Sequence, residues 1–183
     1  MKSFVIPEFE GFNESTNQFF KVKETTLQLE HSLISLKAWE QKWHIPFLNN
    51  KKTVEQTIDY IRCMTINKNV DPIVYYVIPQ NIIDDISKYI EDPMTATWFN
   101  ESGLLGASSK KGEIVTAEII YYWMIELGVP VEFEKWHLNT LLTLIRVISI
   151  KRNKDNDKVN RKMTNAERAA LNAKRRAKYN SKG

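Results

Sequence analysis

The spacing of apolar residues changes near residue 31, from a pattern typical of short strands to one typical of helices. Residues 1–30 mix β-forming residues with the turn formers Pro7 and Gly11, and the segments FFKVK and TTLQLEH alternate well enough to predict a pair of strands. From Ser32 the apolar residues follow a helical period, which predicts a helix that ends before Pro46. The chain therefore begins with a small β element and continues mainly as helices.

Two further helices are indicated in the middle of the chain. Thr53, followed by Gln56 three residues later, forms a capping-box pattern that predicts the start of a helix. The segment IPQNIIDDISKYIED places its apolar residues on one face and predicts another. Between these helices, VDPIVYYVIP is compatible with either a strand or a short helical turn. MTATWF is expected to be a short strand that pairs with the N-terminal ones, and SGLLGASSKKG a flexible loop.

A helical hairpin joined by a tight GVP turn is expected over residues 113–150. Its first helix, EIVTAEIIYYWMIEL, is apolar almost all round, so we expect it to be the central buried helix. Gly128 and Pro130 fit the end of one helix and the start of the next. We expect Trp136 and Leu144 to be buried. The second helix carries a stripe at helical spacing, formed by Phe133, Trp136, Thr140, Leu141, Leu144 and Ile148.

Charge divides the chain into two parts. Residues 151–183 hold 12 Lys and Arg against 3 Asp and Glu, whereas residues 1–150 hold 14 against 19. RNKDNDKVNRK predicts a polar linker, and Thr164 with Glu167 predicts the capped start of a solvated helix. The expected organisation is a mostly helical globular domain with N-terminal strands over 1–150, then a basic linker and transient helical tail over 151–183. The predicted class is α+β, mainly helical.

Candidate catalytic chemistry is sparse. Glu134 and His137 have the Glu-x-x-His spacing of di-iron bundles, but those sites need a second copy that this sequence lacks. Cys63 lies on the apolar side of a predicted helix, which indicates packing, and a single cysteine fits a reducing compartment. GLLGASSKKG lacks the spacing of a phosphate-binding loop. We therefore expect no catalytic, metal or cofactor site and interpret the protein as a non-enzyme.

Membrane contact is not expected either. The N-terminal segment MKSFVIPEFEGF lacks the charged-then-apolar layout of a signal peptide, and no run of about 18 uncharged apolar residues occurs.

Several segments together resemble a type of protein encoded in the tail-gene modules of bacteriophages. The resemblance covers most of residues 31–183. It is carried by HSLISLKAWEQKWHIPFL, KTVEQTIDYIRCMT, MTATWF, IVTAEIIYYWMIELGVPVEFEKWHLNTLLTLIRV and ERAALNAKRRAKYNSKG. Proteins of this type are commonly regarded as tail assembly chaperones, which bind the tape-measure protein and keep it soluble until tail tube subunits polymerise around it. The resemblance implies a non-enzymatic protein in the cytoplasm of the infected bacterial host, with tape-measure and tail tube proteins as partners.

Two groups of residues are candidates for binding these partners. A chaperone for an apolar helical partner needs an apolar groove, and aromatic side chains dominate such surfaces. Trp98 and Phe99, beside the predicted loop, are the best candidates for exposed aromatic residues. Lys174, Arg175 and Arg176 represent the basic tail, which can dock on an acidic protein, neutralise nucleic-acid phosphates or simply solvate the chain.

Other interpretations stay open from the sequence. The chain can be a structural virion protein of the tail or connector, which would place it in the finished particle, or a nucleic-acid-binding phage protein that uses its basic tail. Self-association is also expected, because exposed apolar grooves tend to pair when empty.

Overall fold

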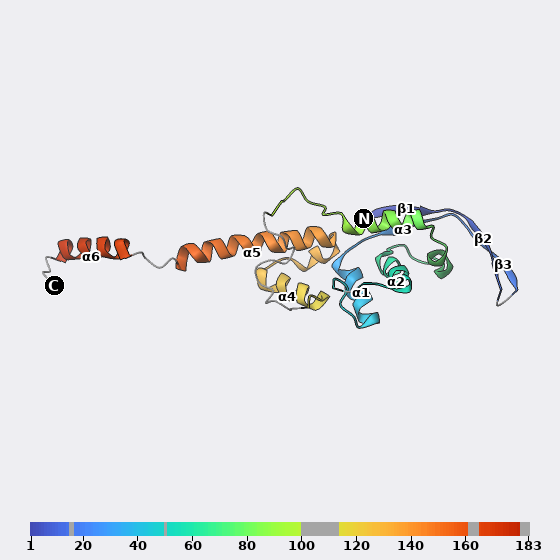
Figure 1. Ribbon diagram of the computed structural model, residues 1–183, viewed down its shortest axis with the longest axis horizontal. Coiled ribbons are helices and arrows are strands. Elements are labelled where there is room, and N and C mark those ends of the chain that lie inside the picture. Colours follow the sequence, from blue (N-terminus) through green and yellow to red (C-terminus); the bar gives the residue numbers. More distant parts are fainter. Residues whose placement is uncertain (15–16, 50, 100–113, 161–164, 180–183) are drawn as a thin grey trace. The chain divides into compact units, whose positions relative to one another are not determined.

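The computed structural model describes residues 1–14, 17–49, 51–99, 114–160 and 165–179 (Figure 1). It divides into two compact units, Met1–Val147 and Ile148–Gly183, and confirms the mainly helical α+β class. The last helix of the first unit, α5, continues into the second unit. In chain order the elements up to this helix are β1 Lys2–Ile6, β2 Phe9–Asn13, β3 Gln18–Val22, β4 Thr25–Leu29, α1 Leu33–Trp43, α2 Val54–Met64, the 3-10 helix η1 Pro72–Tyr76, α3 Gln80–Glu91, α4 Ala117–Leu127, the 3-10 helix η2 Val131–Lys135 and α5 Leu138–Asn160.

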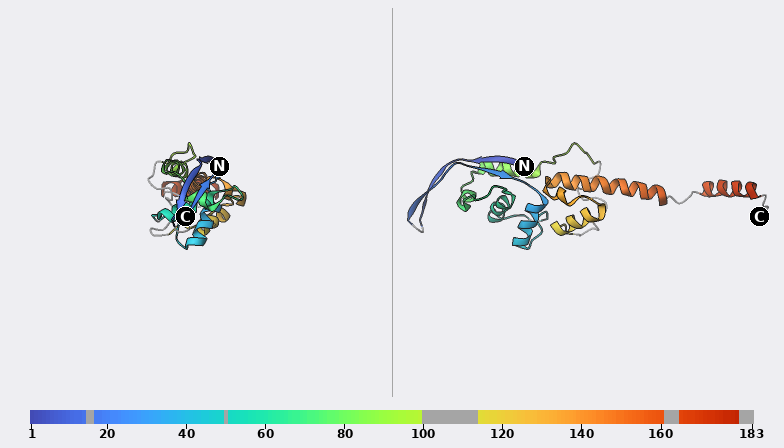
Figure 2. Two further views of the ribbon diagram at one scale, coloured as in Figure 1. Left: turned by 90° about the vertical axis from the view of Figure 1, so that its right-hand side faces the viewer. Right: turned by 180° about the vertical axis from the view of Figure 1, so that it is seen from behind.

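The four strands form one antiparallel ribbon that bends in the middle. β1 pairs with β4, from Lys2 opposite Leu29 to Ile6 opposite Thr25, and β2 pairs with β3 in the same register. Figures 1 and 2 show the ribbon continuing from one pair into the other. FFKVK and TTLQLEH thus contain strands as predicted, but these strands are not partners. The chain reverses between β2 and β3, so β3 and β4 follow each other along the same side of the ribbon.

The half of the ribbon formed by β1 and β4, the proximal half, supplies most of the ribbon's part of the core, and Val22 at the end of β3 is also buried. Phe4, Ile6, Leu27 and Leu29 alternate with outward residues and are buried. The ring of Phe4 lies edge-on to Tyr89 of α3, with 6.2 Å between the ring centroids. The other half, β2 with β3, is the distal half, and its phenylalanines are treated below.

Local capping explains where the first helices begin. Thr53 and Gln56 form the predicted capping box at the start of α2. The preceding helix α1 begins with a similar box made by Ser32 and Ser35, and it ends before Pro46 as predicted. The ambiguous segment VDPIVYYVIP proves to be a short helical turn, the 3-10 helix η1.

The expectation that α4 is the central buried helix is wrong. Ala117, Ile120 and Met124 are buried, but Tyr122 is exposed and Ile125 is 74% exposed. Apolar composition all round allowed burial on every side, yet α4 lies at the surface of the first unit and buries one face, packed against α1. Gly128 ends the helix in the left-handed conformation at φ 69°, as the sequence predicted.

The second helix of the expected hairpin is divided in two. Pro130 precedes the 3-10 helix η2, and α5 begins only at Leu138. Trp136 lies in the break and is 39% exposed, because its ring stacks on Phe133 at 3.9 Å between centroids instead of entering the core. The expected burial of Trp136 is therefore wrong, and Leu144 is only half-buried.

A buried carboxylate, whose role was not predicted from the sequence, joins α1 to α4. Glu40 accepts hydrogen bonds from the backbone N–H of Phe47 and of Ala117, both at 2.7 Å. Ala117 is the first residue of α4, whose leading N–H groups have no partner within the helix. A charged acceptor at that position also interacts favourably with the helix dipole. The acidic side chain in the apolar stripe of α1 is thus explained by capping.

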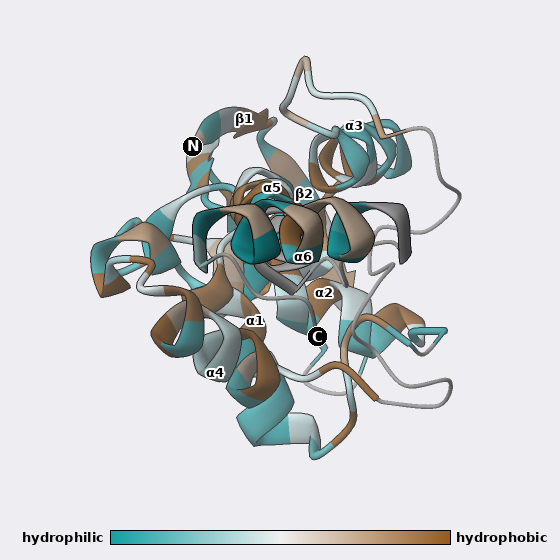
Figure 3. Cartoon of the chain, turned by 90° about the vertical axis from the view of Figure 1, so that its left-hand side faces the viewer, coloured by the Kyte–Doolittle hydropathy of each residue, from teal (hydrophilic) through white to brown (hydrophobic). Residues whose placement is uncertain are grey.

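The second unit holds the end of α5 and the helix α6, Asn165–Tyr179. α5 continues to Asn160, so the predicted polar linker RNKDNDKVNRK is helical over its first nine residues, 152–160. Along residues 167–179 of α6 the side chains are exposed, apart from the half-buried Leu171. Figure 3 shows hydrophilic residues alternating with weakly apolar ones along this helix. Thr164 and the segment SGLLGASSKKG lie outside the described residues.

An apolar pocket beside Trp98 as the candidate functional site

The segment after α3 is held against α5 by side-chain hydrogen bonds. Asn139 donates through Nδ2 to the carbonyl oxygens of Ile90 at 3.0 Å and Asp92 at 2.7 Å, which satisfies an end of α3. Thr140 donates to the carbonyl of Met94 at 3.3 Å. MTATWF is therefore not the short strand that we expected. Its first residue, Met94, bonds to an α5 side chain instead of to a neighbouring strand.

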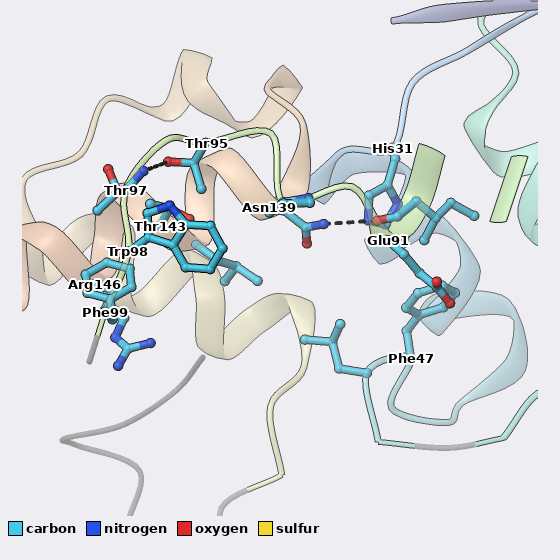
Figure 4. Close-up of a pocket in the computed structure, with 14 residues that line it drawn as sticks. His31, Phe47, Glu91, Thr95, Thr97, Trp98, Phe99, Asn139, Thr143 and Arg146 are labelled. Carbon is cyan, nitrogen blue, oxygen red and sulfur yellow. Dashed lines mark hydrogen bonds between the residues drawn. The ribbon is translucent and has the colours of Figure 1, made fainter. Parts of the chain in front are cut away.

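These contacts place residues 95–99 beside one face of α5. Asn139, Leu142, Thr143 and Arg146 follow the spacing i, i+3, i+4 and i+7 and form one wall of a pocket. The pocket has a volume of about 500 Å³. Its other walls are formed by Thr95, Thr97, Trp98 and Phe99 on one side and by His31, Phe47, Leu48, Ile90, Glu91 and Pro93 on the other. Figure 4 shows Trp98, Phe99 and Arg146 gathered on one side, with His31, Glu91 and Phe47 opposite.

The two aromatic residues predicted to bind a partner do meet at this pocket, in different environments. Trp98 is 91% exposed although its ring lines the pocket. Phe99 is half-buried, and the guanidinium of Arg146 lies 4.0 Å from the centre of its ring. That contact is a cation–π interaction and fixes Phe99 against α5. Trp98 is thus an uncovered indole beside a fixed neighbour.

The chemistry of the pocket suits binding more than proton transfer. His31 is buried, and burial, reinforced by His137 and Lys52, lowers its pKa to about 3, so the ring is neutral at pH 7. Its Nδ1 lies 2.6 Å from the hydroxyl of Tyr60, which holds the ring in the core. The wall is mainly apolar, and a pocket of this size and lining matches the usual description of ligand sites.

Other residues singled out from the sequence do not line this pocket. Glu134 accepts a hydrogen bond from the hydroxyl of Tyr121 at 2.7 Å, whereas His137 donates to the carbonyl of Tyr89 at 3.0 Å. The two members of the Glu-x-x-His pair therefore bond to different partners. Cys63 is half-buried, and burial raises the pKa of its thiol to about 11.

Lys174, Arg175 and Arg176, the basic candidates, are exposed on α6 in the second unit. The structure therefore brings together the aromatic pair, whereas the basic group belongs to the other unit. The wall supplied by α5 was missed from the sequence. The signal for this wall was the helical spacing of the residues from Asn139 to Arg146. It was not recognised because the stripe that includes Leu141, Leu144 and Ile148 is more apolar and lies on the same helix.

Comparison of the chain with protein-family models, with curated proteins and with solved structures gives no match. Within the described ranges, no group of three or more His, Cys, Asp or Glu is placed to hold a metal ion. No helix in the same ranges has the length and apolar character needed to cross a membrane.

Proposed function

We propose that this protein is a bacteriophage tail assembly chaperone that binds the tape-measure protein and keeps it soluble while the tail tube assembles. The observation that carries the proposal is the exposed indole of Trp98 beside an open apolar pocket. A large aromatic ring left in water next to an apolar pocket is typical of an interaction surface. The resemblance of the sequence to proteins of phage tail modules supplies the identity of the partner.

The shape of the pocket supports a helical partner. One wall is a helix face, and an amphipathic helix lays side chains spaced three or four residues apart into such a groove. Trp98 would cover one side of the bound helix, while Leu142 and Phe47 would contact its apolar stripe. Binding of this kind shields apolar side chains from other copies of the partner, and no catalytic step is needed.

The basic α6 is proposed to add a second, electrostatic contact. Its exposed cations attract acidic residues of a protein partner, and such attraction acts over about 10 Å at moderate salt. The basic side chains therefore contribute more to the first capture of the partner than to the contacts of the final complex; they are Lys174, Arg175 and Arg176. A nucleic acid is an alternative ligand of the same helix, and salt-dependent retention of DNA by the full chain would favour it.

The test is co-expression with the tape-measure protein of the same phage. That partner should be insoluble alone and soluble with the chaperone. Trp98→Ser combined with Phe99→Ser should lower the soluble fraction at any salt concentration, because apolar burial depends little on screening. Tyr76→Ser, which removes an exposed aromatic ring outside the pocket, is the matched control and should behave like the parent.

Replacement of Lys174, Arg175 and Arg176 by Gln should reduce co-purification chiefly at low salt. The proposal also requires the protein to be absent from finished particles. If the partner stays soluble with the Trp98 and Phe99 variant, and the protein is found in particles at fixed stoichiometry, it is a structural component of the virion instead.

A further inference from the structure

The distal half of the N-terminal ribbon carries aromatic residues that the described part of the chain leaves uncovered. Phe12 and Phe19 stand directly opposite each other on one face, with ring centroids 4.9 Å apart, and Phe19 is 85% exposed. On the other face, Phe9 and Phe20 lie 6.0 Å apart. A two-stranded ribbon without a covering layer is marginally stable in water. These aromatic pairs therefore point to a surface that is covered in an assembly.

The backbone of the distal half is open as well. Among the described strands, β2 and β3 pair only with each other, so both outer edges present N–H and C=O groups to solvent. An edge of this kind accepts a further strand by main-chain hydrogen bonds. Gly11 brings the rings of Phe9 and Phe20 close to the backbone, since a Cβ at this position would lie within 2.8 Å of both.

Charge is divided between the two strands of the distal half. The stretch 8–14 contains Glu8, Glu10 and Glu14 and no basic residue, whereas the stretch 18–23 contains Lys21 and Lys23 and no acidic residue. Within the chain, Lys21 Nζ lies 2.8 Å from Glu10 and 3.4 Å from Glu8. One edge of the ribbon is therefore acidic and the other basic.

We propose that the distal half pairs edge to edge with the distal half of a second copy, β2 of one chain against β3 of the next. Pairing through two copies of β2 would place Glu beside Glu, and pairing through two copies of β3 would place Lys beside Lys. Like charges on neighbouring strands are destabilising. Pairing β3 of one copy with β2 of the next alternates acid and base and keeps every strand antiparallel to its neighbour.

The aromatic pairs fit the same arrangement. With Lys21 of one copy opposite Glu10 of the next, Phe19 lies opposite Phe12 of that next copy, because the register of each pair is the same. The rings then continue as a row across the growing sheet instead of ending in water. This interface is heterologous, so copies form a ring or a filament and do not stop at a dimer. The inference is independent of the proposed chaperone function.

The test is light scattering of the full chain after size-exclusion chromatography, across a range of protein concentrations. The parent should form species larger than dimers. Phe12→Ser with Phe19→Ser should raise the concentration of half-assembly by about tenfold or more. Tyr76→Ser, which removes an exposed ring outside both the ribbon and the pocket, should leave assembly unchanged. A parent that stays monomeric or stops at a dimer, or a Phe12 and Phe19 variant that assembles like the parent, overturns the proposal.

Charge variants test which edges meet. A chain with Glu8→Lys and Glu10→Lys has two basic edges, and a chain with Lys21→Glu and Lys23→Glu has two acidic edges. Each should be monomeric alone, and an equimolar mixture should assemble again. Recovery in the mixture shows that both variants are folded, and if the mixture stays monomeric the proposed pairing of β2 with β3 is wrong.

Discussion

The two halves of the N-terminal ribbon have one register and the same kind of residues but opposite surroundings. In the proximal half, the ring of Phe4 is buried against Tyr89 of α3. In the distal half, Phe12 and Phe19 contact each other and are exposed to solvent. Alternation makes both halves strands, but a covering helix places the ring of Phe4 in the core. An aromatic pair without such cover indicates an interface, as Trp98 does beside its pocket.

The largest expected difference between the halves is in stability. Phe4→Ala should lower the free energy of unfolding by about 3–5 kcal/mol, since it leaves a cavity under a buried ring. Phe19→Ala should change it by no more than about 0.5 kcal/mol, as surface substitutions usually do. Urea denaturation at a concentration where the chain is monomeric measures both. Equal losses for the two variants would show that the distal half also belongs to the folded core.

Acid should lower the free energy of unfolding through His31, the histidine that follows β4 of the proximal half. His31 has a pKa of about 3 in the fold against an ordinary 6.5, so between these values the unfolded chain binds a proton that the folded chain does not. The free energy of unfolding should therefore fall as pH is lowered from about 6.5 towards 3, by roughly 1.4 kcal/mol per unit from this residue.

Denaturation of variants at several pH values isolates that contribution. His31→Gln should reduce the slope of the free energy of unfolding against pH, because an amide does not titrate. His44→Asn changes an exposed histidine and should leave that slope as it is in the parent. Asparagine is chosen because residue 44 has a φ of 54°, a conformation that asparagine tolerates. An unchanged slope in His31→Gln would mean that this ring is not kept neutral by the fold.

The smallest effect is expected at Gly11. Gly11→Ala places a Cβ within 2.8 Å of the rings of Phe9 and Phe20, which must move aside. Because both rings belong to the distal half, global stability should change by no more than about 0.5 kcal/mol. Hydrogen exchange in β2 and β3 should become faster while exchange in β1 and β4 stays the same. Faster exchange in β1 and β4 as well would show that the ribbon unfolds as one unit.

Features set by neighbouring residues could be predicted from the sequence. Thr53 with Gln56, Pro46 and Gly128 place helix ends correctly, because caps and breakers act within a few residues. The exposure of Trp98 agrees with its place beside a Gly- and Ser-rich segment. Periodicity also found strands in both halves of the ribbon.

Features set by distant contacts could not be predicted. Periodicity shows which residues lie on one face, but it does not show which face another element covers. Ile125 and Trp136 were therefore expected inside and lie at the surface. Glu40 is buried on α1 and bonds to Ala117, 77 residues later, a contact that residue spacing does not show. The α5 wall of the pocket was missed for the same reason.

The central claim is that the pocket beside Trp98 binds a helical partner, and hydrogen–deuterium exchange on the complex tests it most directly. The full chain is compared alone and with the tape-measure protein at one protein concentration. We predict slower exchange at residues 92–99 and along the pocket face of α5, Asn139 to Arg146, when the partner is present, and unchanged exchange at Tyr76. A stable complex in which residues 92–99 exchange as fast as in the free chain would contradict the account.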